Sequence, residues 1–395
     1  MISVNKAKLL IQENILNLPA QLVPLAAAAG YILNKDIYAK TDIPAFEQSS
    51  MDGYAIRFEE RNQPLKVNGE MQAGVETQYI LSPGQAGRIF TRAPLPIGAD
   101  TVVMQEKVRL IDGILTIPDN DLTPGLHVRK KGAEVKKASL AIAKGCRLTP
   151  AAIGFLAGIG ETEVEISQSP SVGIIITGKE LQQPGNDLAF GQVYESNSYA
   201  LHAALQQAQI TKINLYAADD HLDELTAVLK DALQNNDVVL LTGGVSVGDY
   251  DFVVRATALN NITQIFHRVK QKPGKPLYFG RKENKIIFGL PGNPSSVLSC
   301  FYQYVWPALK WMGGAEKDQS DGLQTIEAVL THDYKKAAGL THFLKAHFEN
   351  GNVTPLNAQE SFRMSSFAQA NCMIELSEEE TEFLAGSQLK IYLLP

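Results

Sequence analysis

Apolar strand patterns alternate with amphipathic helical patterns between residues 170 and 314. The strand patterns lie at 171–178, 212–218, 237–244 and 285–290, and the helical patterns lie at 196–210, 221–234, 249–259 and 294–312. Because the strands are almost continuously apolar, helices are expected to cover both faces of the sheet. This predicts a three-layer α/β domain with a mostly parallel sheet over 170–315. Ligands of such sheets bind beyond the carboxyl ends of the strands, so the loops there are the first candidates for a site.

The segments before this domain predict a helical domain that carries a β-rich insertion. Residues 4–32 repeat apolar positions at helical spacing, broken by Pro19 and Pro24, which predicts two short amphipathic helices. At 46–136, short β-rich runs are separated by Gly, Pro and Asp-Gly turns. A helical pattern follows at 148–160 and a strand pattern at 161–167, and this strand can rejoin the opening helices. We therefore expect an inserted β domain within a discontinuous N-terminal scaffold domain, 1–45 plus 137–169, which links the other domains.

The C-terminal residues complete a multidomain α/β and β fold. Four short strand patterns predict a small C-terminal β-barrel-like domain at 320–395. The chain has 395 residues and is 45% apolar, and domains usually contain roughly 100 to 150 residues. It can therefore bury several separate cores.

The charge balance argues against nucleic acid or membrane as a partner. The net charge is −6, from 36 basic and 42 acidic residues without a long single-sign run, so any anionic ligand must be held by a local pocket. The three cysteines, Cys146, Cys300 and Cys372, are far apart and exclude the usual zinc and thioredoxin spacings, which favours a reducing cytoplasm. The N-terminus lacks the pattern of a secretory signal, and no stretch of about 20 apolar residues is long enough to span a bilayer.

The strand at 237–242 runs directly into a polar loop that is suited to phosphate. Glycines let backbone N–H groups approach an anion, a serine adds a donor, and aspartates can hold a hard cation such as Mg²⁺. A glycine pair after a strand is as often simply a tight turn, so both interpretations stay open. The candidate residues are Gly243, Gly244, Ser246, Asp249 and Asp251.

Loops after or between the other strands contain further candidates. Glu180 can bind a metal or accept a hydroxyl, or it is a solvated loop acid. In 272–276, stiff Pro and Gly residues fix the separation of Lys272 and Lys275, so both ammonium groups can meet one anion; the alternative is an ordinary surface turn. Asp219 follows the strand at 212–218 and belongs to the same ligand side of the sheet.

The loop at 291–296 has both a structural and a functional interpretation. Asn293 is a good N-cap and Pro294 suits the first helical position. The same helix start also directs N–H groups toward an anion. In the β-rich insertion, Asp52 is followed by glycine and predicts a turn, or it forms a polar rim with Ser49 and Ser50, to which the nearby segment 88–94 adds Thr91 and Arg92. The residues alone thus indicate a cleft for a polyanion and a metal.

Taken together, these stretches resemble the MoeA family, the molybdopterin molybdenumtransferases, which also includes the E domains of gephyrin and its plant counterpart. The resemblance covers essentially the whole chain in collinear order. The matching segments are SSMDGYAIR, IFTRAPLPIGADTVVMQE, RKKGAEV, TGKELQQPG, VYESNS, TGGVSVGDYDFV, KPGKP, GLPGNPSS and the β-rich C-terminal region.

This resemblance implies an enzyme that inserts molybdenum from molybdate into adenylylated molybdopterin and releases AMP, with Mg²⁺ assisting. It implies that Lys272 and Lys275, with Ser295 or Ser296, attract the molybdate dianion. Catalytic roles would fall to Asp52, Thr91, Glu180, Asp219 and Asp251, the last three as metal ligands. Gly243, Gly244, Ser246, Pro291, Asn293 and Pro294 would seat the nucleotide and pterin phosphates. Lys345 and Ser365 are the candidates from the C-terminal domain.

The resemblance also implies partners, and this chain departs from the family motifs at three positions. Family members are homodimers in which Asp52 and Thr91 would act on the α/β cleft of the other subunit, and contacts with the adenylyltransferase and with apo-molybdoenzymes are expected. Lys179 stands where the family usually has an acid, and Arg92 stands where it usually has a glycine. The aspartate that the family often has after RRGE is shifted or replaced here, which leaves Glu134. Two other functions are weighed against the transferase: a scaffold protein like the gephyrin relatives, and a molybdopterin adenylyltransferase, which would need little more than the α/β domain.

Overall fold

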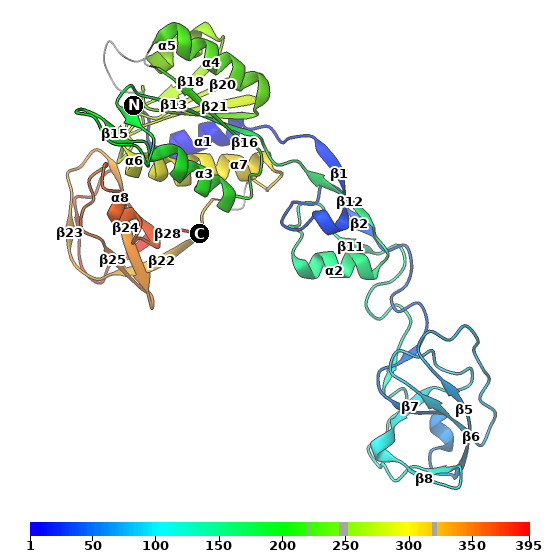
Figure 1. Ribbon diagram of the computed structural model, residues 1–395. Coiled ribbons are helices and arrows are strands. Elements are labelled where there is room, and N and C mark those ends of the chain that lie inside the picture. Colours follow the sequence, from blue (N-terminus) through cyan, green and yellow to red (C-terminus); the bar gives the residue numbers. More distant parts are fainter. Residues whose placement is uncertain (220, 245–251, 318–321) are drawn as a thin grey trace. The chain divides into compact units, whose positions relative to one another are not determined.

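The computed structural model describes residues 1–219, 221–244, 252–317 and 322–395 (Figure 1). These residues form two compact units. Unit 1 comprises Met1–Val23, Gly30–Asn34 and Glu165–Pro395, and unit 2 comprises Pro24–Ala29 and Lys35–Val164. Unit 2 thus holds both the predicted insertion and most of the predicted scaffold, whereas the first residues of the chain belong to unit 1. No helix in the described residues is long and apolar enough to cross a membrane.

A six-stranded sheet forms the centre of unit 1. Its order is β16-β13-β17-β21-β20-β18, and the first four strands are parallel while β20 and β18 are antiparallel to their neighbours. The strands are β13 (Val172–Thr177), β16 (Ile213–Ala218), β17 (Val238–Thr242), β18 (Thr263–His267), β20 (Tyr278–Lys282) and β21 (Lys285–Leu290). The four predicted strands are the parallel ones. The two short antiparallel strands contain Gly, Lys, Arg and Gln, and their patterns do not predict strands.

Helices cover both faces of this sheet, because its buried strands present alternate side chains to two cores. Ile174 and Ile176 share one core with α3 (Asn197–Gln207), whereas Ile175 faces α4 (Leu222–Asn235) and α5 (Phe252–Leu259). Helix α1 (Val4–Asn14) packs into the first core through Val4, Ala7 and Ile11. The second helix predicted before Ile32 is wrong: residues Ala20–Pro24 form β1, paired with β12 (Glu163–Ser167), and only the short turn η1 (Leu25–Ala27) follows.

The helical pattern at 294–312 corresponds to two helices with a π-helical turn between them. These are α6 (Pro294–Cys300), η4 (Phe301–Val305) and α7 (Trp306–Met312). All five residues of η4 are buried. Single π-turns within helices often occur at functional sites. In this one, the hydroxyl of Tyr304 donates to the side chain of Gln271, the residue before Lys272.

The C-terminal domain is a closed five-stranded barrel. The strand order β24-β25-β22-β28-β26 closes through pairing of β24 with β26, which agrees with the predicted barrel-like domain. A short strand, β19 (Gln271–Lys272), joins β24 from the α/β domain. The barrel strands are β22 (Thr325–Leu330), β24 (Thr341–Glu349), β25 (Asn352–Pro355), β26 (Cys372–Leu376) and β28 (Gln388–Leu393), with the additional elements β23 (Tyr334–Lys335), β27 (Glu382–Phe383) and α8 (Met364–Phe367).

Unit 2 contains a second six-stranded sheet, in the order β7-β4-β6-β5-β9-β8. The strands are β4 (Gly53–Ile56), β5 (Leu65–Met71), β6 (Gln85–Ile89), β7 (Thr101–Met104), β8 (Arg109–Ile111) and β9 (Ile114–Thr116). The remaining elements are β2 (Ile37–Tyr38), β3 (Gln48–Ser49), β10 (Val128–Arg129), β11 (Leu140–Ile142), α2 (Pro150–Gly158), η2 (Phe58–Glu60) and η3 (Gln105–Lys107). Gly53 lies in a strand, not in the Asp-Gly turn that was one interpretation of its sequence, and a Cβ there would collide with the carbonyl of Val103.

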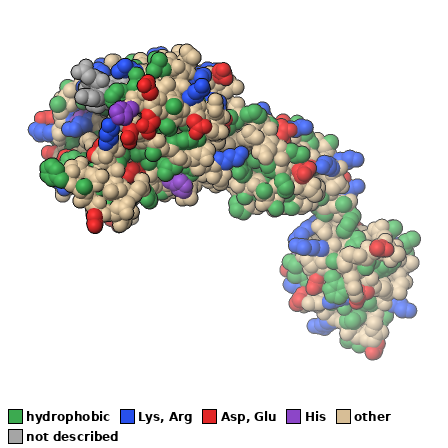
Figure 2. Space-filling model, turned by 45° about the horizontal axis from the view of Figure 1, so that its top comes forward, with side chains coloured by type: hydrophobic (Ala, Val, Ile, Leu, Met, Phe, Trp, Pro, Cys, Tyr) green, Lys and Arg blue, Asp and Glu red, His purple; other side chains and the backbone are tan. Residues whose placement is uncertain are grey.

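On the face drawn in Figure 2, basic and acidic side chains are interspersed. This agrees with a net charge of −6 that is not built from single-sign runs.

Candidate active site

The carboxyl ends of the parallel strands in unit 1 open into a cleft of about 940 Å³. Ile176 pairs with Thr242 and Thr242 with Leu290, so the loops after β13, β17 and β21 start at one level. β16 lies on one side of β13 and β17 on the other, which makes this edge a topological switch point, the usual ligand position in such sheets. Four segments predicted from the sequence line the cleft: residues from 177–181, Gly243 and Gly244, 272–276, and residues from 291–296.

The glycine pair lies directly against the end of β13. At Gly243 the backbone φ is +84°, and a Cβ there would lie 2.9 Å from the Thr177 hydroxyl oxygen. That hydroxyl donates to the carbonyl of Thr242 at 3.1 Å. Glycine is therefore required for the close approach of the two strand ends. The predicted Ser246, Asp249 and Asp251 lie outside the described residues.

Both predicted lysines line the cleft and are exposed. Lys272 and Lys275 flank a loop whose central Gly274 has a φ of +82°. Below the loop, Gln271 is buried and its amide donates to the carbonyl of Gly274 at 2.9 Å. Burial, with the charges of Lys336 and Lys272, lowers the pKa of the neighbouring His342 to about 4. His342 is therefore neutral at pH 7, and the lysines carry the positive charge of this wall.

Groups at the start of α6 make hydrogen bonds to Ser361 of the C-terminal domain. Asn293 is at the N-cap and Pro294 at the first turn, as predicted, but the Asn293 side chain does not cap the helix. Its amide donates to the Ser361 hydroxyl at 2.8 Å, and the N–H of Ser295 donates to the Ser361 carbonyl at 3.1 Å. The predicted role of Ser295 as an anion ligand is corrected, because this side chain is fully buried and does not line the cleft. Ser296, Pro291, Asn293 and Pro294 do line it.

Lys345 has a different position from the one predicted. Its side chain is buried, and its ammonium group donates to the carbonyls of Ala358 at 2.8 Å, Arg363 at 3.1 Å and Glu360 at 3.4 Å. Burial lowers its pKa. Because its protons are directed to backbone carbonyls, Lys345 holds the loop at 356–363 and is not an anion ligand in this geometry. The exposed Ser365 is not among the residues that line the cleft.

The loop that Lys345 holds supplies residues that the sequence did not indicate. Gln359, Ser361 and Phe362 line the cleft, as does Leu340 from the loop that precedes β24. No local pattern marks these residues in the sequence, although Gln359, Ser361 and Phe362 lie between the two C-terminal candidates, Lys345 and Ser365. Their position depends on packing between the barrel and α6, which no local pattern reports.

Two predicted metal ligands lie in the described residues, but only one lines the cleft. Glu180 is exposed and lines it. Asp219 follows β16 at the same sheet edge, since Ala218 pairs with Thr177, yet it is not a lining residue. In the described part of the chain, no three His, Cys, Asp or Glu residues are arranged to hold a metal ion. Asp251, the third predicted ligand, is not part of the described structure.

In unit 2, Asp52 and Thr91 form a compact pair. One carboxylate oxygen of Asp52 accepts from both the N–H and the hydroxyl of Thr91, each at 2.7 Å. These two hydrogen bonds lower the pKa of Asp52, and the charge of Arg88 adds to the effect. Asp52 is therefore a fixed, ionised carboxylate at the surface of unit 2.

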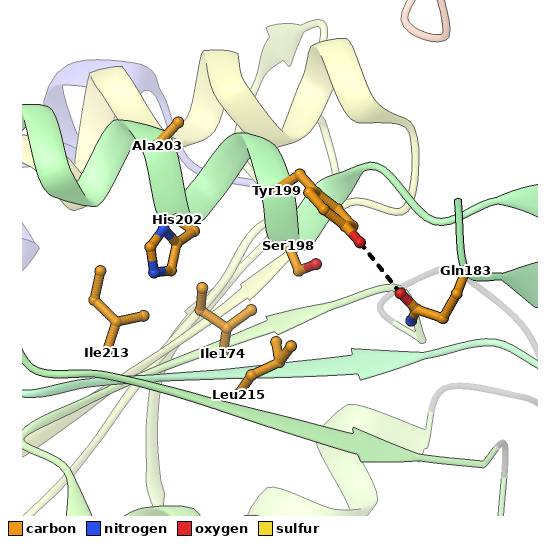
Figure 3. A pocket seen from close by; sticks show the side chains of 8 residues that line it. All are labelled: Ile174, Gln183, Ser198, Tyr199, His202, Ala203, Ile213 and Leu215. Atoms are coloured by element: carbon orange, nitrogen blue, oxygen red, sulfur yellow. Dashed lines mark hydrogen bonds between the residues drawn. The ribbon is translucent and has the colours of Figure 1, made fainter. Parts of the chain in front are cut away.

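A second pocket, of about 480 Å³, lies between α3 and the edge strand β16 (Figure 3). Its floor is apolar, and Tyr199, His202 and Gln183 stand at its polar side. The lining residues are Ile174, Gln183, Ser198, Tyr199, His202, Ala203, Ile213 and Leu215. None of the predicted site residues that the structure describes belongs to this set.

Comparison with known proteins identifies the family. Three family models match in order: the MoeA N-terminal region (domain I and II) at residues 2–160, the probable molybdopterin binding domain at 173–311 and the MoeA C-terminal region (domain IV) at 327–394. A curated molybdopterin molybdenumtransferase from Haemophilus influenzae is 35% identical over 376 residues, which cover 93% of this chain and 92% of that protein. The chain belongs to the MoeA family.

Further MoeA relatives agree with this assignment. A curated molybdopterin molybdenumtransferase from Staphylococcus aureus is 33% identical over 389 residues, covering 95% of this chain and 92% of that protein. The crystal structure of the molybdopterin biosynthesis moeA protein from Pyrococcus horikoshii OT3 matches with a TM-score of 0.83 and 29% identity, over 100% of both chains. The family resemblance inferred from the sequence motifs is thus confirmed.

The departures from the MoeA motifs have definite positions. Arg92 has a φ of +69°, the left-handed region that favours the glycine usual there. The ammonium nitrogen of Lys179 lies 3.1 Å from Nε2 of His221. Glu134 lines a small pocket of unit 2 together with Arg129. Of these three residues, only Lys179 is next to a residue of the MoeA cleft, Glu180.

Proposed function

We propose that the protein inserts molybdenum from molybdate into adenylylated molybdopterin with release of AMP, in the biosynthesis of the molybdenum cofactor. The observation that carries this proposal is the single cleft that joins the glycine pair, the two lysines, Glu180 and the start of α6. A ligand for this cleft must carry several negative charges. Its volume of about 940 Å³ is near the upper end of the range for small-molecule sites, which suits a large two-ring substrate together with an oxoanion.

The lysines are suited to hold the oxoanion. An ammonium group is a compact point charge with rotatable donors, so Lys272 and Lys275 can both contact a tetrahedral dianion. The buried Gln271 and the glycine between the lysines fix the backbone from which both side chains start. In the proposed reaction, the lysines hold molybdate beside the dithiol, both sulfurs bind molybdenum, and their two protons convert one oxo ligand into the water that leaves.

The glycine pair is suited to the phosphate groups. Without Cβ atoms, the loop after β17 can approach phosphate oxygens closely with its N–H groups. Water adds to the molybdopterin phosphorus, the bond from that atom to the bridging oxygen breaks, AMP leaves with that oxygen, and the proton of the water passes to solvent. Positive charge from the lysines stabilises the charge that develops on the phosphate oxygens.

Magnesium is part of the proposal. Mg²⁺ is commonly bound through one or two carboxylates together with substrate phosphates, and Glu180 is the described carboxylate that lines the cleft. When bound, the ion would neutralise phosphate charge. Glu180 would orient it.

The proposal also includes a cytoplasmic homodimer in which Asp52 and Thr91 complete the site of the partner subunit. The support from this chain is that Asp52 is ionised and held by two hydrogen bonds, yet its carboxylate is exposed on the surface of unit 2. Such a group is preorganised for a ligand that unit 2 alone does not enclose.

The test is to incubate the pure protein with adenylylated molybdopterin, Mg²⁺ and molybdate, and to measure both AMP and the activation of an apo-molybdoenzyme. We expect AMP to appear in step with activation, and both to depend on molybdate. Turnover only with ATP and free molybdopterin would instead identify an adenylyltransferase. Binding without AMP release under all conditions would favour the scaffold function. Lys230→Ala, which changes an exposed lysine on α4 away from the cleft, serves as the control variant.

A further inference from the structure

Phe362 is a large, exposed apolar side chain in a cleft that also contains charged and polar groups. It lines the cleft, yet 60% of its surface remains accessible to solvent. The guanidinium carbon of Arg363 lies 5.3 Å from the centre of its ring. Single exposed apolar side chains are common on protein surfaces, but this ring stands beside the lysines and the glycine pair in the same cleft.

The backbone on both sides of this ring is held rigidly. The ammonium group of Lys345 donates to the carbonyls of Ala358, Glu360 and Arg363. The amide of Gln359 donates to the carbonyls of Lys345 at 2.8 Å and Leu356 at 2.7 Å. A buried ammonium group costs free energy unless it is hydrogen-bonded, so these three bonds favour the one loop conformation that provides them. The loop is therefore built to keep one conformation.

The residue before Phe362 ties this loop to the anion-binding wall. Ser361 accepts from the Asn293 amide at 2.8 Å and, through its carbonyl, from the Ser295 N–H at 3.1 Å. Asn293 belongs to the loop that follows β21 at the ligand edge of the sheet. The ring of Phe362 is thus held at a set position relative to the groups that would bind phosphate.

We propose that Phe362 is a stacking platform for a planar heteroaromatic ring of the substrate. A ligand that carries both a flat ring and negative charges can stack on Phe362 and bind the two lysines at the same time. Stacking needs no specific hydrogen bonds, and aromatic side chains hold the bases of nucleic acids in this way. This inference rests on the proposed function, whose substrate has two such rings, a pterin and an adenine. The shared chemistry is the planar ring, and experiment must distinguish its two sources.

The experiment measures binding by calorimetry of two separate probes, AMP and 6-hydroxymethylpterin, to the full-length wild-type protein and to Phe362→Leu and Phe362→Trp. Leucine keeps an apolar side chain but removes the aromatic ring, whereas tryptophan keeps stacking. We expect Phe362→Leu to weaken one of the two probes by roughly ten-fold and Phe362→Trp to keep wild-type affinity or exceed it. The probe that is weakened identifies the ring that stacks. Tyr199→Leu, which changes an exposed aromatic residue on α3 that does not line the cleft, should change neither affinity.

Molybdate binding shows whether Phe362→Leu changes only the binding of a ring or the whole cleft. Phe362→Leu should leave molybdate affinity unchanged, because the lysines are untouched, and its melting temperature should stay near that of the wild type. Equal binding of both probes by wild type and Phe362→Leu would overturn the inference and leave the proposed function standing. Failure of the wild type to bind either probe would overturn the proposed function and this inference together.

Discussion

The side-chain amide of Gln271 donates to the backbone carbonyl of Gly274 at 2.9 Å, so a buried residue closes the loop that presents Lys272 and Lys275. The carbonyl oxygen of the same side chain accepts from the hydroxyl of Tyr304, which lies in the π-helical turn η4. Through Gln271, the conformation of the lysine loop thus depends on a residue of the helix below it.

Gln271→Leu should therefore weaken both the fold and the anion site. The substitution leaves the Tyr304 hydroxyl and the Gly274 carbonyl without their partner, which should cost about 1–3 kcal/mol of unfolding free energy. It should also raise the molybdate concentration needed for half-maximal AMP release. Denaturant unfolding and AMP assays measure the two effects. Gln264→Leu changes an exposed glutamine on β18 and is the control. Wild-type molybdate dependence in Gln271→Leu would show that the lysine loop does not need this support.

Lys275→Ala should raise the molybdate requirement by roughly ten-fold, since one of two point charges is removed from an exposed site. The deficit should shrink as ionic strength increases, because salt screens the charge that wild type retains. Steady-state AMP release at several molybdate and salt concentrations measures this. Lys230→Ala should match the wild type. An unaltered molybdate dependence in Lys275→Ala would count against an anion site at this loop.

Sequence reasoning predicted the cleft through one physical rule. Parallel strands end at one edge of a sheet, so Glu180, Gly243 and Asn293, each in a loop after such a strand, could be placed together without any contact information. The four parallel strands were predictable for a related reason. Burial on both faces makes their residues almost continuously apolar.

Residues whose roles depend on distant packing could not be predicted in this way. Lys345 looks like an anion ligand in the sequence, but its ammonium group is bound to the carbonyls of its own domain. Ser295 follows a helix start, but the packing of α6 buries it. Phe362 has no signal at all, because exposure of an aromatic side chain is a property of the folded loop.

Glu180→Ala should reduce AMP release by at least about a hundred-fold while leaving stability within roughly 0.5 kcal/mol of the wild type. The carboxylate is exposed, so its removal leaves no buried group unpaired, and the loss falls on the chemical step. AMP release at several Mg²⁺ concentrations, with denaturant unfolding in parallel, gives both quantities. Glu379→Ala removes an exposed acid of the barrel domain as a control. Full turnover in Glu180→Ala would remove this residue from the proposed site.

Acidification should destabilise the protein between about pH 6.5 and pH 4 through His342. Burial and the charges of Lys336 and Lys272 lower its folded-state pKa from 6.5 to about 4. Between these values the unfolded chain binds the proton and the folded chain does not, so the unfolding free energy falls as pH falls, by at most about 1.4 kcal/mol per pH unit from this group. Above pH 6.5 the imidazole is neutral in both states and its contribution is constant.

His342→Gln should remove this slope between pH 5 and pH 6.5, where the carboxylates with lowered pKa values do not yet titrate. Urea unfolding at closely spaced pH values measures it, with His202→Gln, an exposed histidine on α3, as the control. Equal slopes in wild type and His342→Gln would mean that the folded protein takes up a proton at His342 as readily as the unfolded chain. In that case the wall beside Lys272 would carry an additional positive charge below pH 6.5, and anion affinity should rise there.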